Sequence, residues 1–217
     1  MRWVELMIGM IMPMIESKNM EDKNGSGPLK LSRVVVPSHY DLHVKVMDAG
    51  FCGSVGIQVD ISEPVDEIVM NAKELEIWDA GIVVGDKRID GEVVVGDYEK
   101  EYEVVRLRFP SRIPKGEGYI VAEFCGDYNS GLVGFYKSGG DSKIYSTHFE
   151  PTDARRVFPC FDQPDMKATF SISLDAPANL VVLSNSPAVG SSRKEYGDRA
   201  IEYFEKTSKM STYLLHL

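Results

Sequence analysis

Apolar and polar residues alternate along much of this chain, and this period of two is the feature that most limits its fold. The clearest example is residues 39–46, HYDLHVKV, in which every second residue is apolar. The same alternation occurs at residues 55–61, 105–109 and 170–174. Further segments with strand character lie at residues 67–72, 91–95, 118–125, 180–184, 200–206 and 211–217. No segment sustains an apolar helical stripe over three turns, so the sequence predicts a mainly β domain: a β-sandwich, or a curved pair of sheets, of about a dozen strands.

Charge and cysteine content narrow the class of partners. The chain has 33 acidic and 24 basic residues, a net charge of −9, which disfavours binding to nucleic acid or to an anionic membrane surface. Its three cysteines, Cys52, Cys125 and Cys160, are odd in number and far apart in the sequence. We therefore expect buried, reduced thiols in a cytoplasmic protein, with neither a disulfide framework nor a metal knuckle.

The first 28 residues are expected to form a disordered leader and tether. Residues 1–15 begin like a secretory signal, but Glu5 interrupts the apolar run, Pro13 ends it, and no small-residue cleavage site follows. The run is also too short to span a bilayer, which takes about 20 apolar residues. Residues 16–28 are polar and rich in small side chains. The folded β domain is therefore predicted to cover residues 29–217.

Two histidines, His39 and His43, have the spacing of zinc ligands on a helix. The surrounding alternation predicts a strand instead, on which four residues cover about 13 Å. Two nitrogens bound to one zinc ion lie no more than about 4 Å apart, so the pair cannot share a metal. The chain also contains no H-E-x-x-H, G-x-S-x-G, P-loop or dinucleotide-binding motif. The sequence therefore predicts neither a metal site nor a catalytic residue within this chain.

Residues 147–165, THFEPTDARRVFPCFDQPD, combine six charged side chains with three phenylalanines and three prolines. The prolines fix the direction of the chain, and Thr152 can cap a short helix at residues 152–158 that Pro159 ends. Arginines suit the fixing of such loops through ion pairs with nearby aspartates. Glu150 differs, because it follows an apparent strand at 143–149 and immediately precedes a proline. A carboxylate that leaves the end of a rigid element is a good candidate for binding a cationic ligand.

Residues 145–174 closely resemble a segment near the end of the N-terminal domain of zinc aminopeptidases of the aminopeptidase N and puromycin-sensitive type, the gluzincin aminopeptidases. Four further segments resemble landmarks of that family in the same order: 31–42 (LSRVVVPSHYDL), 67–77 (EIVMNAKELEI), 131–138 (GLVGFYKS) and 210–215 (MSTYLL). The resemblance covers residues 29–217. It implies a saddle-shaped, mostly β N-terminal domain that packs against the protein's own thermolysin-like catalytic domain.

The family's zinc helix, distal glutamate ligand and catalytic tyrosine have no counterpart in this sequence. The resemblance therefore implies an enzyme that uses zinc in its full-length form, whereas this chain alone is expected to bind no metal and to be inactive. The implied partners are peptides with a free N-terminus. In the resembling enzymes, the residue at the position of Glu150 helps to bind the α-ammonium group of the substrate.

His148 falls where many members of the resembling family carry a glutamine that lines the first side-chain pocket. A solvated strand residue is the alternative interpretation of His148. Two other functions remain open: a non-catalytic adaptor, such as the family-like subunit of a general transcription factor, and an epoxide-hydrolase-type relative, which carries glutamine at the Glu150 position. Glu150 argues against the epoxide-hydrolase alternative and, more weakly, against the adaptor.

Overall fold

The computed structural model describes residues 30–139, 143–190 and 193–217 of the chain. The leader predicted at residues 1–28 lies outside the described residues. Within the described part, most of the regular structure is strand, which confirms the mainly β prediction. The largest sheet has eight strands in the order β12 (Lys194–Tyr196), β13 (Arg199–Tyr203), β11 (Thr169–Pro177), β1 (Val35–Val46), β2 (Phe51–Ile61), β8 (Gly116–Gly126), β4 (Leu75–Val84) and β5 (Lys87–Asp90).

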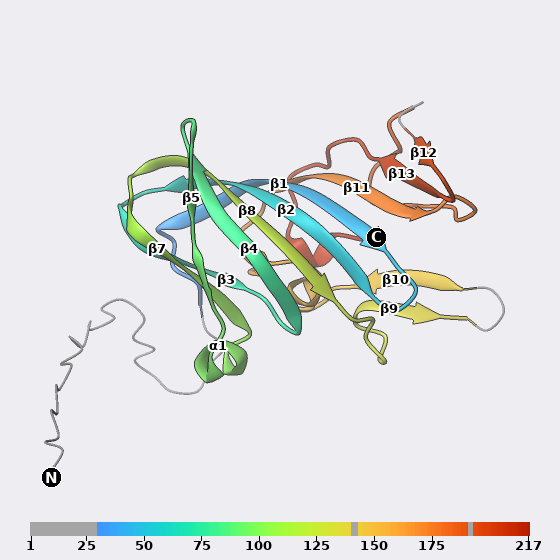
Figure 1. The fold of residues 1–217 in the computed structure, drawn as a ribbon, viewed down its shortest axis with the longest axis horizontal. Helices are drawn as coiled ribbons and strands as arrows, with labels where there is room; N and C mark the ends of the chain where they lie inside the picture. Colours follow the sequence, from blue (N-terminus) through green and yellow to red (C-terminus); the bar gives the residue numbers. More distant parts are fainter. Residues whose placement is uncertain (1–29, 140–142, 191–192) are drawn as a thin grey trace, which may run out of the picture.

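Two smaller sheets lie against one face of this large sheet, which curves over them (Figure 1). One has the strand order β3 (Val65–Asn71), β7 (Val104–Ile113) and β6 (Glu92–Val94), and the other pairs β9 (Gly134–Ser138) with β10 (Ile144–His148). The helical elements of the described residues are short: α1 (Asp97–Glu101) and the 3-10 turns η1 (Ala154–Arg156) and η2 (Thr212–Leu214). The turn η1 falls within the helix predicted at 152–158.

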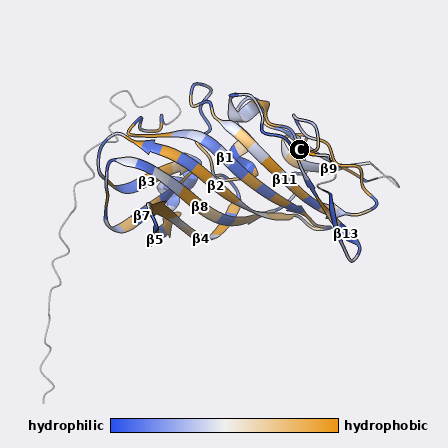
Figure 2. Ribbon diagram, turned by 90° about the horizontal axis from the view of Figure 1, so that it is seen from above, coloured by the Kyte–Doolittle hydropathy of each residue, from blue (hydrophilic) through white to orange (hydrophobic). Residues whose placement is uncertain are grey.

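Strand β1 shows how the alternating sequence produces a two-faced sheet. Tyr40, Leu42 and Val44 are buried, whereas Asp41 and Lys45 between them are exposed. The neighbouring strand β11 alternates in the same way, with Phe170, Ile172 and Leu174 buried, and Figure 2 shows hydrophobic and hydrophilic residues mixed along the strands of the sheet. Each fully buried aliphatic or aromatic side chain contributes about 1.5–3 kcal/mol to folding, so the pattern fixes which face of each strand packs inward.

Tyr40 joins the large sheet to the charged and aromatic segment at residues 147–165. Its ring stacks on Phe170 of the parallel neighbour β11 at 4.8 Å and meets the edge of Phe158 at 6.1 Å. Its hydroxyl oxygen accepts a hydrogen bond from the backbone N–H of Phe161 at 3.1 Å. The 147–165 segment therefore lies on the inner face of the sheet, and the polar face of β1 points away from it.

Several predicted elements differ from the structure. Residues 180–184 and 211–217 are not strands: the only regular element in them is η2, and side chains rather than a backbone ladder join the two segments. Strand β4 was not predicted, because a bulge between Ile77 and Asp79 breaks its alternation. Strand β9 and the helix α1 were also not predicted, because both are too short to show a hydrophobic periodicity.

The cysteine prediction was wrong for two of the three residues. Cys52 and Cys125 form a disulfide, because the antiparallel register of β2 and β8 places them directly opposite each other with Cα atoms 4.0 Å apart. A separation of 73 residues in the sequence hides this proximity. Cys160 is a buried free thiol, as expected, and burial raises its pKa well above the ordinary value.

Alkylation of the denatured protein without reductant is expected to label one cysteine, Cys160, and alkylation after reduction is expected to label all three. Mass spectrometry of the peptides that contain each cysteine measures this directly. Equal labelling of Cys52 and Cys125 before and after reduction would show that the disulfide does not form in solution.

Candidate functional site

The end of β10 presents His148 and Glu150 to solvent. The residues that alternate with them, Thr147 and Phe149, are both buried. Thr147 is held by Leu217, whose backbone N–H donates to the Thr147 hydroxyl oxygen at 2.8 Å, and Phe149 packs against the ring of Phe158. Anchoring two alternate residues inward fixes the outward direction of the other two.

His148 is tied to the neighbouring loop. Its Nδ1–H donates to the backbone carbonyl of Leu132 at 3.1 Å, which leaves Nε2 as the free nitrogen of the ring. The side chain is exposed, as both interpretations of this residue require. The structure therefore exposes both His148 and Glu150 at the end of β10.

The Glu150 carboxylate makes no hydrogen bond or ion pair with any residue that the structure describes. The three aspartates of the same segment are all paired: Asp153 with Arg156, Asp162 with Arg155 and Asp165 with Arg33. The predicted pairing of the arginines with nearby aspartates is thereby confirmed. Glu150 precedes Pro151 through a cis peptide bond and is exposed. An exposed, uncompensated carboxylate in a segment whose other acids are paired is available to bind a cation.

Arg155 is the centre of the ion-pair network that holds the segment. Its Nε lies 2.9 Å from the Asp162 carboxylate and its Nη1 lies 3.1 Å from Glu103. Asp162 is only 4% exposed and also accepts a hydrogen bond from the Thr212 hydroxyl. Burial alone would raise the pKa of Glu103, but hydrogen bonds and charge from Lys73 and Arg155 outweigh it and lower that pKa. A buried carboxylate that is paired in this way fixes the loop without being free for a ligand.

Arg156 links the same segment to the β9–β10 pair. Its guanidinium binds Asp153 at 2.7 Å and also contacts Glu74. Its side chain lies over Gly134, the first residue of β9, where a Cβ atom would come within 3.0 Å of the arginine Cδ. Gly134 also has a φ of +64°, which favours glycine. Because Gly134 pairs with His148, this contact supports the strand end that carries the site.

Sequence reasoning missed the acidic partners contributed by other parts of the chain. Glu74 and Glu103 lie 82 and 52 residues from the arginines that they bind. No local pattern marks them, since both owe their place to the register of the strands around them.

Histidines do not assemble a metal site in the described residues, where no three His, Cys, Asp or Glu side chains come together. His39 and His43 both lie on β1, as predicted, and their Nδ1 atoms bond to Thr169 and Ser173 of β11 at 2.7 and 2.8 Å. Residues 30–139, 143–190 and 193–217 therefore contain no ligand set of the kind that holds a catalytic zinc ion. No helix in the described part of the chain is long and apolar enough to cross a membrane.

The described residues thus form a curved, mainly β domain that holds one unpaired carboxylate, Glu150, at its surface. Residues 36–214 match the peptidase M1 N-terminal domain, and the chain belongs to this family. The resemblance noted in the sequence is thereby confirmed.

The chain is similar to aminopeptidases of several organisms. It is 67% identical over 215 residues to probable M1 family aminopeptidase 2 of Encephalitozoon cuniculi, a match that covers 99% of this chain and 25% of the relative. It is 38% identical over 198 residues to aminopeptidase M1-A of Oryza sativa subsp. japonica, covering 87% and 22%. It is 36% identical over 200 residues to human endoplasmic reticulum aminopeptidase 2, covering 86% and 21%. The chain thus spans a quarter or less of the length of each of these three relatives.

Proposed function

We propose that this chain is the substrate-recognition N-terminal domain of a zinc aminopeptidase that removes N-terminal residues from peptides. Glu150 binds the α-ammonium group of the peptide, and His148 lines the pocket for the first side chain. The observation that carries the proposal is the Glu150 carboxylate, which is held at the end of an anchored strand and has no partner among the described residues.

The chemistry of an exopeptidase requires such a group. A terminal ammonium differs from an internal amide chiefly by its charge, and a carboxylate in a largely dry cleft selects that charge. At about 4 Å and an effective dielectric constant of about 20, the attraction is roughly 4 kcal/mol before desolvation. Closure of the cleft by the protein's own catalytic domain supplies the low dielectric that the exposed Glu150 lacks in this chain.

Zinc is the metal that this proposal assigns to the full-length enzyme, where ligands outside this chain would hold it. The proposed domain boundary at residue 29 and the leader at 1–28 remain predictions. A cytoplasmic location also stays a prediction, and the Cys52–Cys125 disulfide weakens it, because that prediction assumed reduced cysteines. The names of the relatives support the aminopeptidase over the adaptor and the epoxide-hydrolase alternative.

Hydrolysis of a matched pair of peptides tests the proposed function. The full-length protein is expected to release the first residue of an unblocked peptide and to leave its N-acetylated form intact. Cleavage of both peptides at the same rate would contradict recognition of a free ammonium, and cleavage of neither would contradict the aminopeptidase assignment.

An exposed apolar patch predicts a second property of the isolated chain. Val181, Leu183 and Leu214 are 87%, 72% and 51% exposed. Their two segments are joined by hydrogen bonds, from Ser184 to the His216 carbonyl and from Asn185 to the Leu214 carbonyl. Such side chains fit a surface that the catalytic domain covers.

The isolated chain is therefore expected to self-associate at high concentration, with a weight-average mass in light scattering that rises with concentration. The double variant Val181→Ser with Leu183→Ser is expected to reduce this self-association. Asp60→Asn, an exposed residue of β2 outside the patch, serves as a control and should leave it unchanged. A constant monomer mass across the concentration range would count against the patch as a covered surface.

A further inference from the structure

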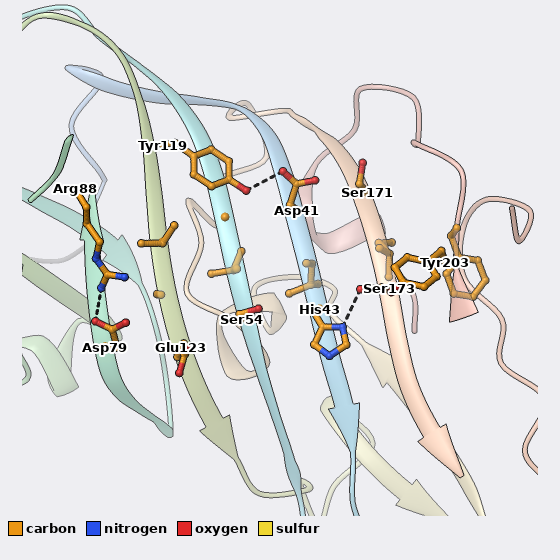
Figure 3. Close-up of a pocket in the computed structure, with 17 residues that line it drawn as sticks. Asp41, His43, Ser54, Asp79, Arg88, Tyr119, Glu123, Ser171, Ser173 and Tyr203 are labelled. Carbon is orange, nitrogen blue, oxygen red and sulfur yellow. Dashed lines mark hydrogen bonds and ion pairs between the residues drawn. The ribbon is translucent and has the colours of Figure 1, made fainter. Parts of the chain in front are cut away.

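The outer face of the large sheet carries a groove that the aminopeptidase proposal does not use. Its volume is about 500 Å³, and side chains of seven strands, from Arg88 on β5 to Tyr203 on β13, line it (Figure 3). We call it the outer groove. Because Tyr40 points inward to the 147–165 segment and the adjacent Asp41 points into the groove, the outer groove lies on the opposite face of the sheet from that segment.

The centre of the outer groove is built around Asp41 of β1. Tyr119 of β8 lies across Gly56 of β2 and donates its hydroxyl hydrogen to the Asp41 carboxylate at 2.9 Å. Only glycine allows this crossing, since a Cβ at Gly56 would lie 1.8 Å from the tyrosine oxygen. The other Asp41 oxygen lies 3.2 Å from Nε2 of His39. Burial and Asp41 raise the pKa of Tyr119 to about 12, so the hydroxyl stays a donor at neutral pH.

A second carboxylate, Glu123 of β8, lies in the same groove. It accepts a hydrogen bond from the indole N–H of Trp78 at 3.0 Å, and the Trp78 side chain is 51% exposed. No lysine or arginine of the described residues pairs with Asp41 or with Glu123. Asp79, by contrast, is neutralised by Arg88. The outer groove therefore offers two carboxylates that no lysine or arginine of the described residues neutralises, beside an exposed aromatic ring, and such a ring also attracts cations.

The shape of the outer groove favours a long occupant. Seven strands about 4.8 Å apart span roughly 29 Å, which equals eight or nine residues of extended peptide. A volume of about 500 Å³ spread over that length makes a shallow channel rather than a compact pocket. An extended segment that stays partly in solvent fits such a channel better than a compact molecule.

The spacing of the two carboxylates sets the spacing of the charges that they can meet. Asp41 is level with Gly56 and with Val121, and Glu123 lies two residues further along β8. Two strand spacings and two residues place the Cα atoms of Asp41 and Glu123 about 12 Å apart. Residues four apart in an extended peptide lie about 13 Å apart.

We propose that the outer groove binds an extended basic segment of a protein or peptide partner, with lysine or arginine side chains four residues apart that meet Asp41 and Glu123. The charge complementarity of the groove carries this choice of occupant. The site is independent of Glu150 and of the proposed peptidase chemistry, because it lies on the other face of the sheet.

Titration calorimetry with a defined probe tests the proposal. The probe is a ten-residue peptide of glycine and serine with lysines at positions 4 and 8, acetylated and amidated so that it has no α-ammonium for Glu150. The full-length protein is compared with Asp41→Asn and Glu123→Gln, which keep side-chain shape. Asp60→Asn is the matched control, because Asp60 is exposed on β2 but does not line the groove.

We expect binding of the probe that weakens with salt. Because the ion pairs are partly exposed, each groove variant is expected to bind the probe about threefold to fivefold more weakly, and the double variant about tenfold or more weakly. Asp60→Asn is expected to change the affinity less than twofold. Absence of binding, or an equal loss in the control, would overturn the proposal. Tighter binding of spermidine than of the peptide would also overturn it, because the groove would then be a site for a small polycation. Loss of activity in Glu150→Gln leaves these results unchanged.

Discussion

Glu150→Gln in the full-length protein is expected to lower kcat/KM for an unblocked peptide by roughly thirtyfold to several thousandfold. The substitution keeps the shape of the side chain and removes its charge, so under the proposed function the substrate ammonium would lose its ionic partner inside the closed cleft. Removal of one member of a desolvated charge pair costs about 2–5 kcal/mol, which sets that range. In the proposed function the same contact also orients the scissile bond, so kcat is expected to fall together with apparent affinity.

The loss must come from recognition and not from unfolding. Glu150 is exposed and makes no hydrogen bond or ion pair with the described residues, so the melting temperature and the zinc content should stay near those of the wild type. A variant that keeps near-normal kcat/KM on an unblocked dipeptide amide would show that Glu150 is one more surface charge on the loop.

Arg155→Met is expected to act in the opposite way, by lowering stability first. Its removal leaves Asp162, 4% exposed, without its cationic partner. Breaking one side of a buried pair typically costs about 3–5 kcal/mol, so a clear fall in the urea midpoint and in the melting temperature should follow. The kcat/KM per folded molecule, measured at a temperature where the variant is folded, should stay within a few fold of the wild type.

Arg155→Lys keeps the charge but not the two-pronged geometry, so it should lose less stability than Arg155→Met. Unchanged denaturation of the methionine variant would contradict the structural role of Arg155.

The same cluster predicts how stability depends on pH. The pKa of Glu103 is lowered in the folded protein, because Lys73 and Arg155 outweigh the effect of burial. A carboxyl group with a lowered folded pKa contributes stability above its unfolded pKa, about 4.3, and loses it as the pH falls toward the folded value. As the pH falls below about 4.3, the free energy of unfolding should therefore decrease less in Arg155→Met than in the wild type. An equal decrease would contradict the role of Arg155 in lowering the pKa of Glu103.

The β-strands could be predicted where one face is buried and the other is exposed, as in β1, because apolar and polar residues then alternate along the sequence. Strand β4 could not, since its bulge changes which residues face inward. Residues 180–184 have the composition of a strand, yet a strand also requires a partner backbone, and the described residues provide none. Composition alone does not reveal whether that partner is present.

The candidate site was predictable only in part. Position before a proline and after a strand singled out Glu150, and resemblance to a family gave it a role. Its lack of a partner could not be foreseen, because it depends on where Arg155 and Arg156 find their acids, Glu103 and Glu74. The outer groove could not be predicted either, because only the register of the strands brings Asp41 and Glu123 into one channel.

The most direct test of the role of Glu150 is a pair of inhibition constants measured on two forms of the full-length protein. A dipeptide analogue with a free N-terminus and its desamino counterpart differ only in the ammonium group. The wild type is expected to prefer the amine by about thirtyfold or more, and Glu150→Gln is expected to lose most of that preference. The same preference in both proteins would mean that the ammonium is bound elsewhere.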